Sequence, residues 1–227
     1  MATQRINAPT LIDVAKRTDP DGKIATIVEL LSQTNPILQD MSWVEGNLAT
    51  GHKTTVRTGL PEATWRLLNY GVQPSKSTTA QITDSCGMLE AYAETDKKLA
   101  DLNGNTAAFR LSEDMSFIEA MNQQQAETLF YGDTSLTPQR FMGLAPRYSV
   151  LDAPNAQNII NGGGTSTTNT SIWLVVWGNN TAHGIYPKGS SAGLSHQDLG
   201  EVTLLDANGG KYQGYRTHYK WESGQLS

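Results

Sequence analysis

Residues 112–131, SEDMSFIEAMNQQQAETLFY, carry the strongest helical pattern in this chain of 227 residues. Ser112 suits a helix start, and the two acids that follow it favour the positive end of the helix dipole. Apolar residues recur at helical spacing along one stripe: Met115, Ile118, Met121, Ala126 and Leu129. Gly132 is typical of the position just after a helix. The pattern predicts a long helix at about residues 112–131, inside a wider region, residues 87–132, that also looks helical.

The polar face of this predicted helix is acidic. From residue 113 to residue 133 the chain has five acids and no basic residue: Glu113, Asp114, Glu119, Glu127 and Asp133. Uncompensated carboxylates create a negative potential that attracts cationic partners. The outer face of the helix is therefore predicted to be anionic, and the five acids are candidates for an interface.

Residues 50–85, in contrast to this acidic face, carry a net positive charge. The segment 52–58, HKTTVRT, is rich in β-branched residues but has no clean apolar face. A strand that is polar on both sides cannot be held in register by a core of its own, so this ribbon is expected to be exposed or covered by another chain. The net charge of residues 50–85 is +2, which leaves −7 for the rest of the chain. The charged residues of the segment are Lys53, Arg57, Arg66 and Lys76 against Glu62 and Asp84. Trp65 is a candidate intersubunit anchor, because Trp and Arg dominate interface hot spots.

The first 40 residues are predicted to form an arm with short helices. Thr10 and Asp13 form a capping-box-like start for a helix at residues 11–17. Asp21 is predicted to cap a second helix, whose apolar side chains share one face: Ile24, Ile27, Val28 and Leu31. Asn35-Pro36 is expected to end that helix, since the residue before a proline avoids the α conformation.

Beyond residue 134 the pattern changes to strands and loops. Residues 171–177, SIWLVVW, predict the best buried strand of the chain, with Trp173 and Trp177 in the core. Residues 202–205 and 211–216, joined by the turn sequence DANGG, predict a β-hairpin.

The composition argues against several classes of protein. A net charge of −5 and a pI of about 5.3 do not fit a generic nucleic-acid binder, which would present a basic face. No apolar run approaches the roughly 20 residues of a membrane-spanning helix. The histidines lack the spacing of a zinc site, and no metal or cofactor is expected: His52, His183, His196 and His218. Cys86 is the only cysteine, which fits a reducing compartment or a virion assembled in one.

One pattern points to a serine hydrolase. Residues 189–193, GSSAG, match the G-x-S-x-G nucleophile elbow, with Asp206 and His218 downstream of Ser191 in the order of α/β-hydrolases. The elbow needs a strand that leads into the serine and a helix that leaves it. Pro187 and Lys188 precede the motif and no helical stripe follows it, so a chance match in a loop is the favoured interpretation.

Several stretches taken together resemble the major capsid proteins of tailed bacteriophages, specifically an epsilon-fifteen-like podovirus group. The similarity runs in order over essentially the whole chain, in these segments: residues 87–102, 109–114 (FRLSED), 129–132 (LFYG), 141–148 (FMGLAPRY), 171–177 and 184–189 (GIYPKG). The resemblance implies an α+β protein with the Hong Kong 97-type capsid fold. It also implies that residues 187–191 form a structural loop, which weakens the hydrolase hypothesis.

The resemblance further implies a division of the chain into four parts. These are an N-terminal arm at residues 1–40, an extended β-hairpin arm at 41–86, a peripheral domain at 87–149 with a spine helix at about 112–131, and an axial domain at 150–227. Relatives continue past the position that matches residues 221–227, with strands that return to the peripheral domain. The axial part is therefore expected to lack those strands in this sequence.

The implied function is structural and not enzymatic. Many copies would form the pentamers and hexamers of an icosahedral shell, assembled in the host bacterial cytoplasm, which encloses double-stranded DNA without sequence-specific binding. Portal, scaffolding and decoration proteins are further implied partners. In the family the extended arm lies over the neighbouring peripheral domain, so Arg57 and Arg66 are expected to meet some of the acids Glu119, Glu127 and Asp133. A nanocompartment shell of the encapsulin type, which encloses enzymes, is the alternative.

Overall fold

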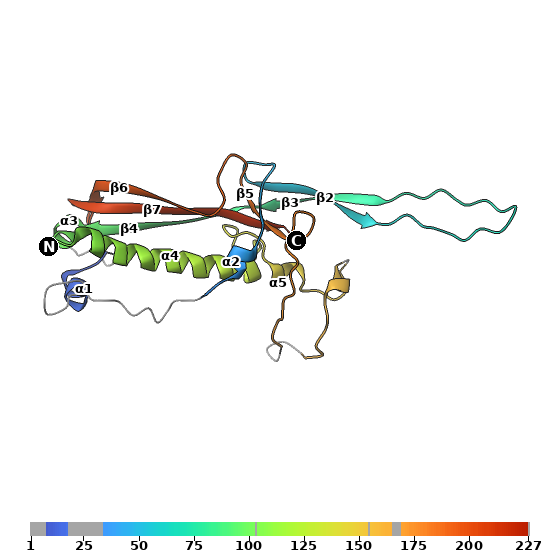
Figure 1. Ribbon diagram of the computed structural model, residues 1–227, viewed down its shortest axis with the longest axis horizontal. Coiled ribbons are helices and arrows are strands. Elements are labelled where there is room, and N and C mark those ends of the chain that lie inside the picture. Colours follow the sequence, from blue (N-terminus) through green and yellow to red (C-terminus); the bar gives the residue numbers. More distant parts are fainter. Residues whose placement is uncertain (1–7, 18–33, 103, 154, 165–168, 227) are drawn as a thin grey trace. The chain divides into compact units, whose positions relative to one another are not determined.

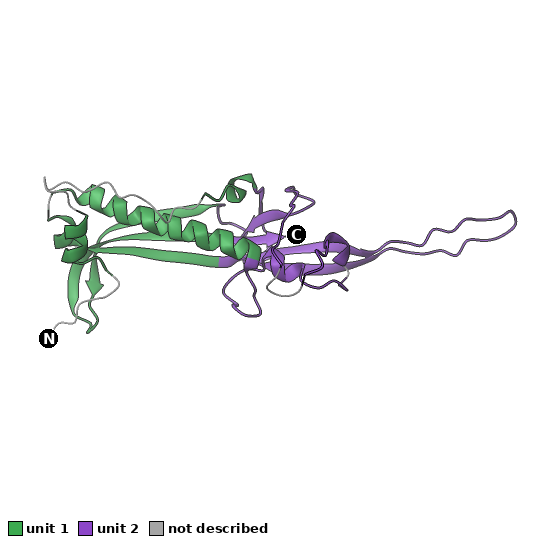
Figure 2. Ribbon diagram, turned by 90° about the horizontal axis from the view of Figure 1, so that it is seen from below, with its two compact units in different colours: residues 1–40, 88–130, 193–222 green, residues 41–87, 131–192, 223–227 purple. Residues whose placement is uncertain are grey.

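The computed structural model describes residues 8–17, 34–102, 104–153, 155–164 and 169–226. The chain divides into two compact units, coloured separately in Figure 2. Unit 1 comprises residues 1–40, 88–130 and 193–222, and unit 2 comprises residues 41–87, 131–192 and 223–227. Helices and strands both contribute, so the fold class is α+β as predicted.

Unit 1 is a long helix on a strand layer. Helix α4 (Thr106–Tyr131) runs along the strands in Figure 1, and strand β7 (Lys211–Leu226) lies between β4 (Gly87–Asp96) and β6 (Leu194–Leu205). Met121 of the helix packs on Ala93 and Tyr219 of two strands, and this cluster extends to partly buried neighbours: Leu89, Ala91, Phe117, Leu194 and Trp221. The long helix was thus correctly predicted, and it begins six residues earlier than expected.

Unit 1 contains a second, smaller hydrophobic cluster. Val14 of α1 (Leu11–Lys16), Ala100 of α3 (Lys97–Ala100) and Phe109 of α4 are buried together. The predicted capping box is present at the start of α1. The backbone N–H and the hydroxyl of Thr10 both donate to Oδ2 of Asp13. The predicted helix with Ile24, Ile27, Val28 and Leu31 lies outside the described residues.

The predicted hairpin is confirmed and is longer than expected. Strands β6 and β7 pair antiparallel from Leu205 and Lys211 back to Leu194 and Trp221, with one irregularity between Asp198 and Glu201. In the turn, the carboxylate of Asp206 accepts hydrogen bonds from the backbone N–H groups of Asn208 and Gly210. Gly209 adopts a φ of 82°, which a glycine accepts at little cost.

Unit 2 contains the ribbon β2 (Gly51–Gly59) and β3 (Thr78–Ser85), which pair antiparallel. Strand β5 (His183–Tyr186) lies between β1 (Trp43–Glu45) and the last residues of β7. The remaining elements are short: α5 (Leu144–Arg147) and the 3₁₀ helix η1 (Ala156–Asn158). Helix α2 (Ile37–Asp40) belongs to unit 1.

Four sequence-based predictions for residues 87–177 were wrong. Residues 87–96 form strand β4 and not helix, because alternate residues such as Ala91 and Ala93 turn toward the core while β7 pairs alongside. Residues 171–177 form no strand: Ile172 and Leu174 are almost fully exposed, and only Trp177 makes an isolated bridge, to Ala182.

The other two errors concern the buried face of α4 and the burial of two tryptophans. Met121, Ala126 and Leu129 are buried as expected, whereas Met115 and Ile118 are exposed, because the buried face is completed by Phe109, Gln125 and Thr128 instead. Trp173 and Trp177 are only half-buried.

Among the described helices, none is both long enough and apolar enough to cross a bilayer.

Candidate assembly surface

The β2–β3 ribbon continues into a long loop without strands, residues 60–77, and we call ribbon and loop together the arm (Figure 1). Along β2 the residues alternate between half-buried and exposed, and from Leu60 to Thr83 every residue is exposed. The arm was expected to have no core of its own, and within the described chain it has none.

The loop is more apolar than the sequence analysis recognised. Trp65 has a relative exposure of 104%, and five further large apolar side chains of the loop are at least half exposed: Leu60, Leu67, Leu68, Tyr70 and Val72. Contiguous exposed apolar side chains on a soluble protein typically mark an interaction site. Only Trp65 was identified from the sequence, although the density of Leu, Tyr and Val in residues 60–72 was a signal that could have revealed the rest.

The four predicted cations of the arm are also exposed. None of Lys53, Arg57, Arg66 and Lys76 forms an ion pair with any residue that the structure describes. Of the two acids, Asp84 is bound at the base of the arm and Glu62 is exposed. The projecting part of the arm, residues 51–83, therefore has four cations against one acid, a charge of +3.

The base of the arm is fixed by a buried ion pair. Asp84 on β3 is 7% exposed, and its Oδ1 lies 2.5 Å from Nη2 of Arg147 on α5. The same nitrogen donates to the backbone carbonyl of Gln225 at 3.0 Å. On the opposite strand, a Cβ on Gly51 would lie 2.0 Å from the carbonyl oxygen of Asp84, so only glycine allows the two strands to approach this closely.

The five acids of the predicted anionic face do not have one common role. Glu113 forms an ion pair with Arg17, and Asp114 is partly buried with hydrogen bonds to Tyr219 and Thr217. Glu119 accepts a hydrogen bond from Gln123, while Glu127 is exposed. Asp133 lies beyond the helix, where hydrogen bonds from Ser135 lower the pKa of its carboxyl. Glu113 and Asp114 are thus engaged in contacts within the chain.

Asp114 belongs to a polar cluster between α4 and the strands of unit 1. Arg110 donates to Asp198 at 2.6 Å and to Thr217 at 3.3 Å, and its guanidinium lies 4.9 Å from the centre of the Tyr215 ring. The hydrogen bond from Arg110 lowers the pKa of Asp198. Burial, together with the nearby Asp114 carboxylate, raises the pKa of Tyr219 to about 12, and burial also raises the pKa of Asp114.

The raised pKa of Asp114 predicts a pH dependence of stability. Protonated Asp114 contributes stability that is complete below the ordinary pKa of 3.8 and is lost as pH rises through the higher folded-state pKa. In urea titrations at several pH values from about 3 to 7, Asp114→Asn is therefore expected to gain stability relative to wild type as the pH increases. A constant difference across this range would contradict the prediction.

The hydrolase residues do not form a triad in this structure. Ser191 follows a turn in which Ser190 donates its N–H to the carbonyl of Pro187. The Asp206 carboxylate is occupied in its own turn, and His218 lies 3.1 Å from Glu90 and stacks on Tyr92. Within the described part of the chain, no group of three or more His, Cys, Asp or Glu residues could hold a metal ion.

Comparisons with known proteins are consistent with an assembling protein. The sequence model of the major capsid protein GP7 family matches residues 19–226. The cryo-EM structure of bacteriophage Epsilon15 matches with 38% identity and a TM-score of 0.71, over 99% of this chain and 71% of that one. No curated protein matches.

Two more distant structures share the fold. The capsid of a native GTA particle has a TM-score of 0.52 at 13% identity, over 97% of this chain and 95% of that one. Microbacterium phage Oxtober96 has a TM-score of 0.52 at 12% identity, over 96% and 92% of the two chains. At these identities the comparison supports the fold alone, and the fold is that of phage capsids.

Proposed function

Because this chain belongs to the major capsid protein GP7 family, we propose that it assembles through its arm, which lies over a second copy of the chain. It is a major capsid protein of the Epsilon15-like tailed phages, a structural component of the virion and not an enzyme. The assembly proposal rests on the exposed arm. Its projecting segment has a charge of +3 and six exposed apolar side chains that no described residue covers, which is typical of a surface that binds another protein.

The proposed product is an icosahedral shell made of pentamers and hexamers that encloses double-stranded DNA. A head-to-tail contact repeated around a ring closes by symmetry, so one arm per subunit is sufficient to link all members of the ring. The net charge of −5 suits such a container, because few lysines and arginines are present to hold the DNA by its phosphates. Portal, scaffolding and decoration proteins are the further partners in this proposal.

The proposed division into domains follows the packing of the described residues. Residues 1–40 would be the N-terminal arm and residues 41–86 the extended arm. Residues 193–222 pack with α4 and β4 in unit 1, so we assign the β6–β7 hairpin to the peripheral domain together with most of residues 87–149. The proposed axial domain, 150–227 by sequence, is thereby reduced mainly to residues 150–192.

Electrostatics would orient the arm on its neighbour. We expect Arg57 and Arg66 of one copy to approach some of the acids Glu119, Glu127 and Asp133 of the next. Each exposed ion pair contributes only about 0–1 kcal/mol, but a shell repeats every pair in all of its subunits. The charges would thus determine the register of the arm, and the apolar loop would supply most of the affinity.

Charge reversal tests this arrangement. The double variant Arg57→Glu/Arg66→Glu is expected to stop shell formation at low salt, because two charges that face an acidic surface change sign. Adding Glu119→Lys/Glu127→Lys should restore it, as followed by sedimentation and negative-stain microscopy.

The matched control is Lys188→Glu/Lys211→Glu. This variant changes the net charge by the same amount at two exposed lysines outside the arm, and it should assemble like wild type. Normal assembly of the Arg57→Glu/Arg66→Glu variant at low salt, or failure of the control, would remove the basis for docking guided by the arm.

A further inference from the structure

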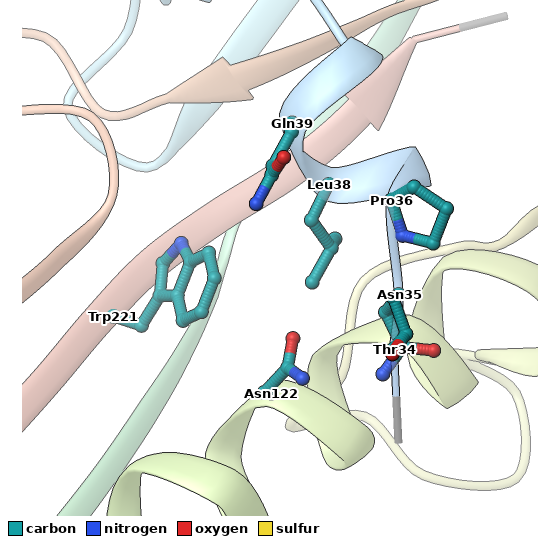
Figure 3. Close-up of a pocket in the computed structure, with 7 residues that line it drawn as sticks. All are labelled: Thr34, Asn35, Pro36, Leu38, Gln39, Asn122 and Trp221. Carbon is teal, nitrogen blue, oxygen red and sulfur yellow. The ribbon is translucent and has the colours of Figure 1, made fainter. Parts of the chain in front are cut away.

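Unit 1 contains a cavity of about 400 Å³ where α2, α4 and β7 meet (Figure 3). The seven residues that line it are uncharged: Thr34, Asn35, Pro36, Leu38, Gln39, Asn122 and Trp221. Figure 3 shows Leu38 and Gln39 reaching from α2, and Asn122 from α4, toward the space beside the Trp221 ring. The volume lies within the range of about 300–1,000 Å³ that is typical of pockets for small organic groups.

Two residues that line this cavity each have a buried hydrogen-bond donor without a partner among the described residues. The indole Nε1 of Trp221 and the amide Nδ2 of Asn35 are both shielded from solvent, and neither is hydrogen-bonded to any residue that the structure describes. A buried donor without an acceptor is costly and rare in folded proteins. The amide of Gln39 also offers an oxygen acceptor at the wall. The cavity is therefore suited to a flat apolar group that has its own N–H and lies next to acceptor oxygens.

The tip of the arm presents a group of this kind. Trp65 is fully exposed and combines a large apolar ring with one N–H donor. The backbone of residues 63–66 makes no hydrogen bond within the described chain, so its carbonyl oxygens are available. The neighbouring exposed side chains Leu60, Leu67 and Leu68 offer comparable area but no donor, which makes them poorer matches to the amide-lined wall.

We propose that Trp65 of one copy inserts into this cavity of a second copy. The indole N–H of Trp65 would donate to the amide oxygen of Gln39, and backbone carbonyls beside Trp65 would accept from Trp221 and Asn35. The inference rests on the proposed docking of the arm and adds its anchor residue and its receptor. A second copy is the occupant because the family's capsid proteins assemble into shells of many identical chains.

Disulfide trapping tests the contact directly while keeping Trp65 in place. In a Cys86→Ala background, Thr64→Cys and Thr34→Cys place one thiol beside Trp65 and one at the cavity wall. Oxidation of assembled particles is expected to produce a ladder of cross-linked chains on a denaturing gel. The control pair Thr64→Cys/Gln213→Cys puts the second thiol at an exposed position of β7 outside the cavity and should give no ladder. Cross-links confined to single chains, or equal ladders in both pairs, would overturn the proposal.

Assembly yields provide the second readout. Trp65→Ala is expected to reduce the yield of particles by about tenfold or more, the size of effect associated with losing a hot-spot residue. Trp65→Phe should retain part of the wild-type yield. The control Leu60→Ala removes another exposed side chain of the same loop and should assemble nearly like wild type. Equal yields for Trp65→Ala and Leu60→Ala would contradict the anchor role.

The two proposals fail in different ways. If Trp65→Ala assembles normally while Arg57→Glu/Arg66→Glu does not, the arm docks but its anchor lies elsewhere. If both variants assemble normally, the arm does not drive assembly, and both proposals are wrong. Filling the cavity with Asn122→Trp should reproduce the Trp65→Ala defect, provided that circular dichroism of the unassembled chain shows an unchanged fold.

Discussion

Replacing Arg147 with methionine is expected to lower the free energy of unfolding by about 3–5 kcal/mol. The side chain of Asp84 is buried at the base of the arm, and its closest cation is the Arg147 guanidinium at 2.5 Å. Methionine fills a similar volume but removes the positive charge, so Asp84 would remain buried without compensation. The carbonyls of Gln225 and Met142 would lose a donor as well. Urea unfolding of the unassembled chain measures the loss.

A matched variant separates this effect from the general cost of removing an arginine. Arg57→Met makes the same chemical change at an exposed position that forms no ion pair with a described residue, and it should alter stability by no more than about 0.5 kcal/mol. Adding Asp84→Asn to Arg147→Met should recover part of the loss, because no uncompensated charge then remains. Equal losses in Arg147→Met and Arg57→Met would show that the buried pair has no special role.

Gly214→Ala is expected to destabilise the chain by about 1–3 kcal/mol through overpacking. Gly214 lies in the middle strand of unit 1, and an added Cβ would come within 2.4 Å of Leu204 Cδ1 and 2.7 Å of the carbonyl oxygen of Thr95. Leu204 is fully buried and has little room to move. The Thr95 carbonyl belongs to the backbone of β4, so relief of the clash requires that strand to shift.

The comparison for this prediction is Gly162→Ala. Nothing lies within 4 Å of a Cβ at Gly162, and its φ is not positive, so alanine there should be neutral or slightly stabilising by reducing the entropy of the unfolded chain. Thermal unfolding of the two variants side by side should therefore show a decrease in midpoint only for Gly214→Ala. A similar midpoint for both would mean that β4 and β7 tolerate a wider spacing.

Local patterns were sufficient to predict the elements whose signals lie within one segment. The capping box at Thr10 and Asp13, the turn at Asp206 and the long helix all depend on residues close in sequence. The errors arose where distant partners decide the outcome. Residues 87–96 contain good helix formers, yet pairing with β7 and burial of Ala93 favour a strand. The apolar run at residues 171–177 indicates only that burial would be favourable, and it does not specify which surface provides the burial.

The charge of the candidate assembly surface was predictable from the sequence, whereas the contacts of its acids within the chain and the position of the cavity were not. The polar ribbon and its four cations follow directly from composition, and so does the choice of Trp65. The use of Glu113 and Asp114 within the chain was not foreseeable, because Arg17 and Tyr219 reach α4 from opposite ends of the sequence. The cavity beside Trp221 was equally hidden, since its walls come from three segments that are far apart along the chain.

The arm is held tightly at its base, whereas its loop can bend. At Gly51 and Asp84 the two strands are in close contact, and Asp84 is bound to Arg147, whereas residues 60–77 lack any ladder of backbone hydrogen bonds. Bending such a loop breaks no secondary structure and costs little free energy. In a shell with both five- and six-membered rings, identical subunits meet at unequal angles. Differences in local curvature would then be absorbed in this loop, so that the rest of the subunit can remain nearly rigid.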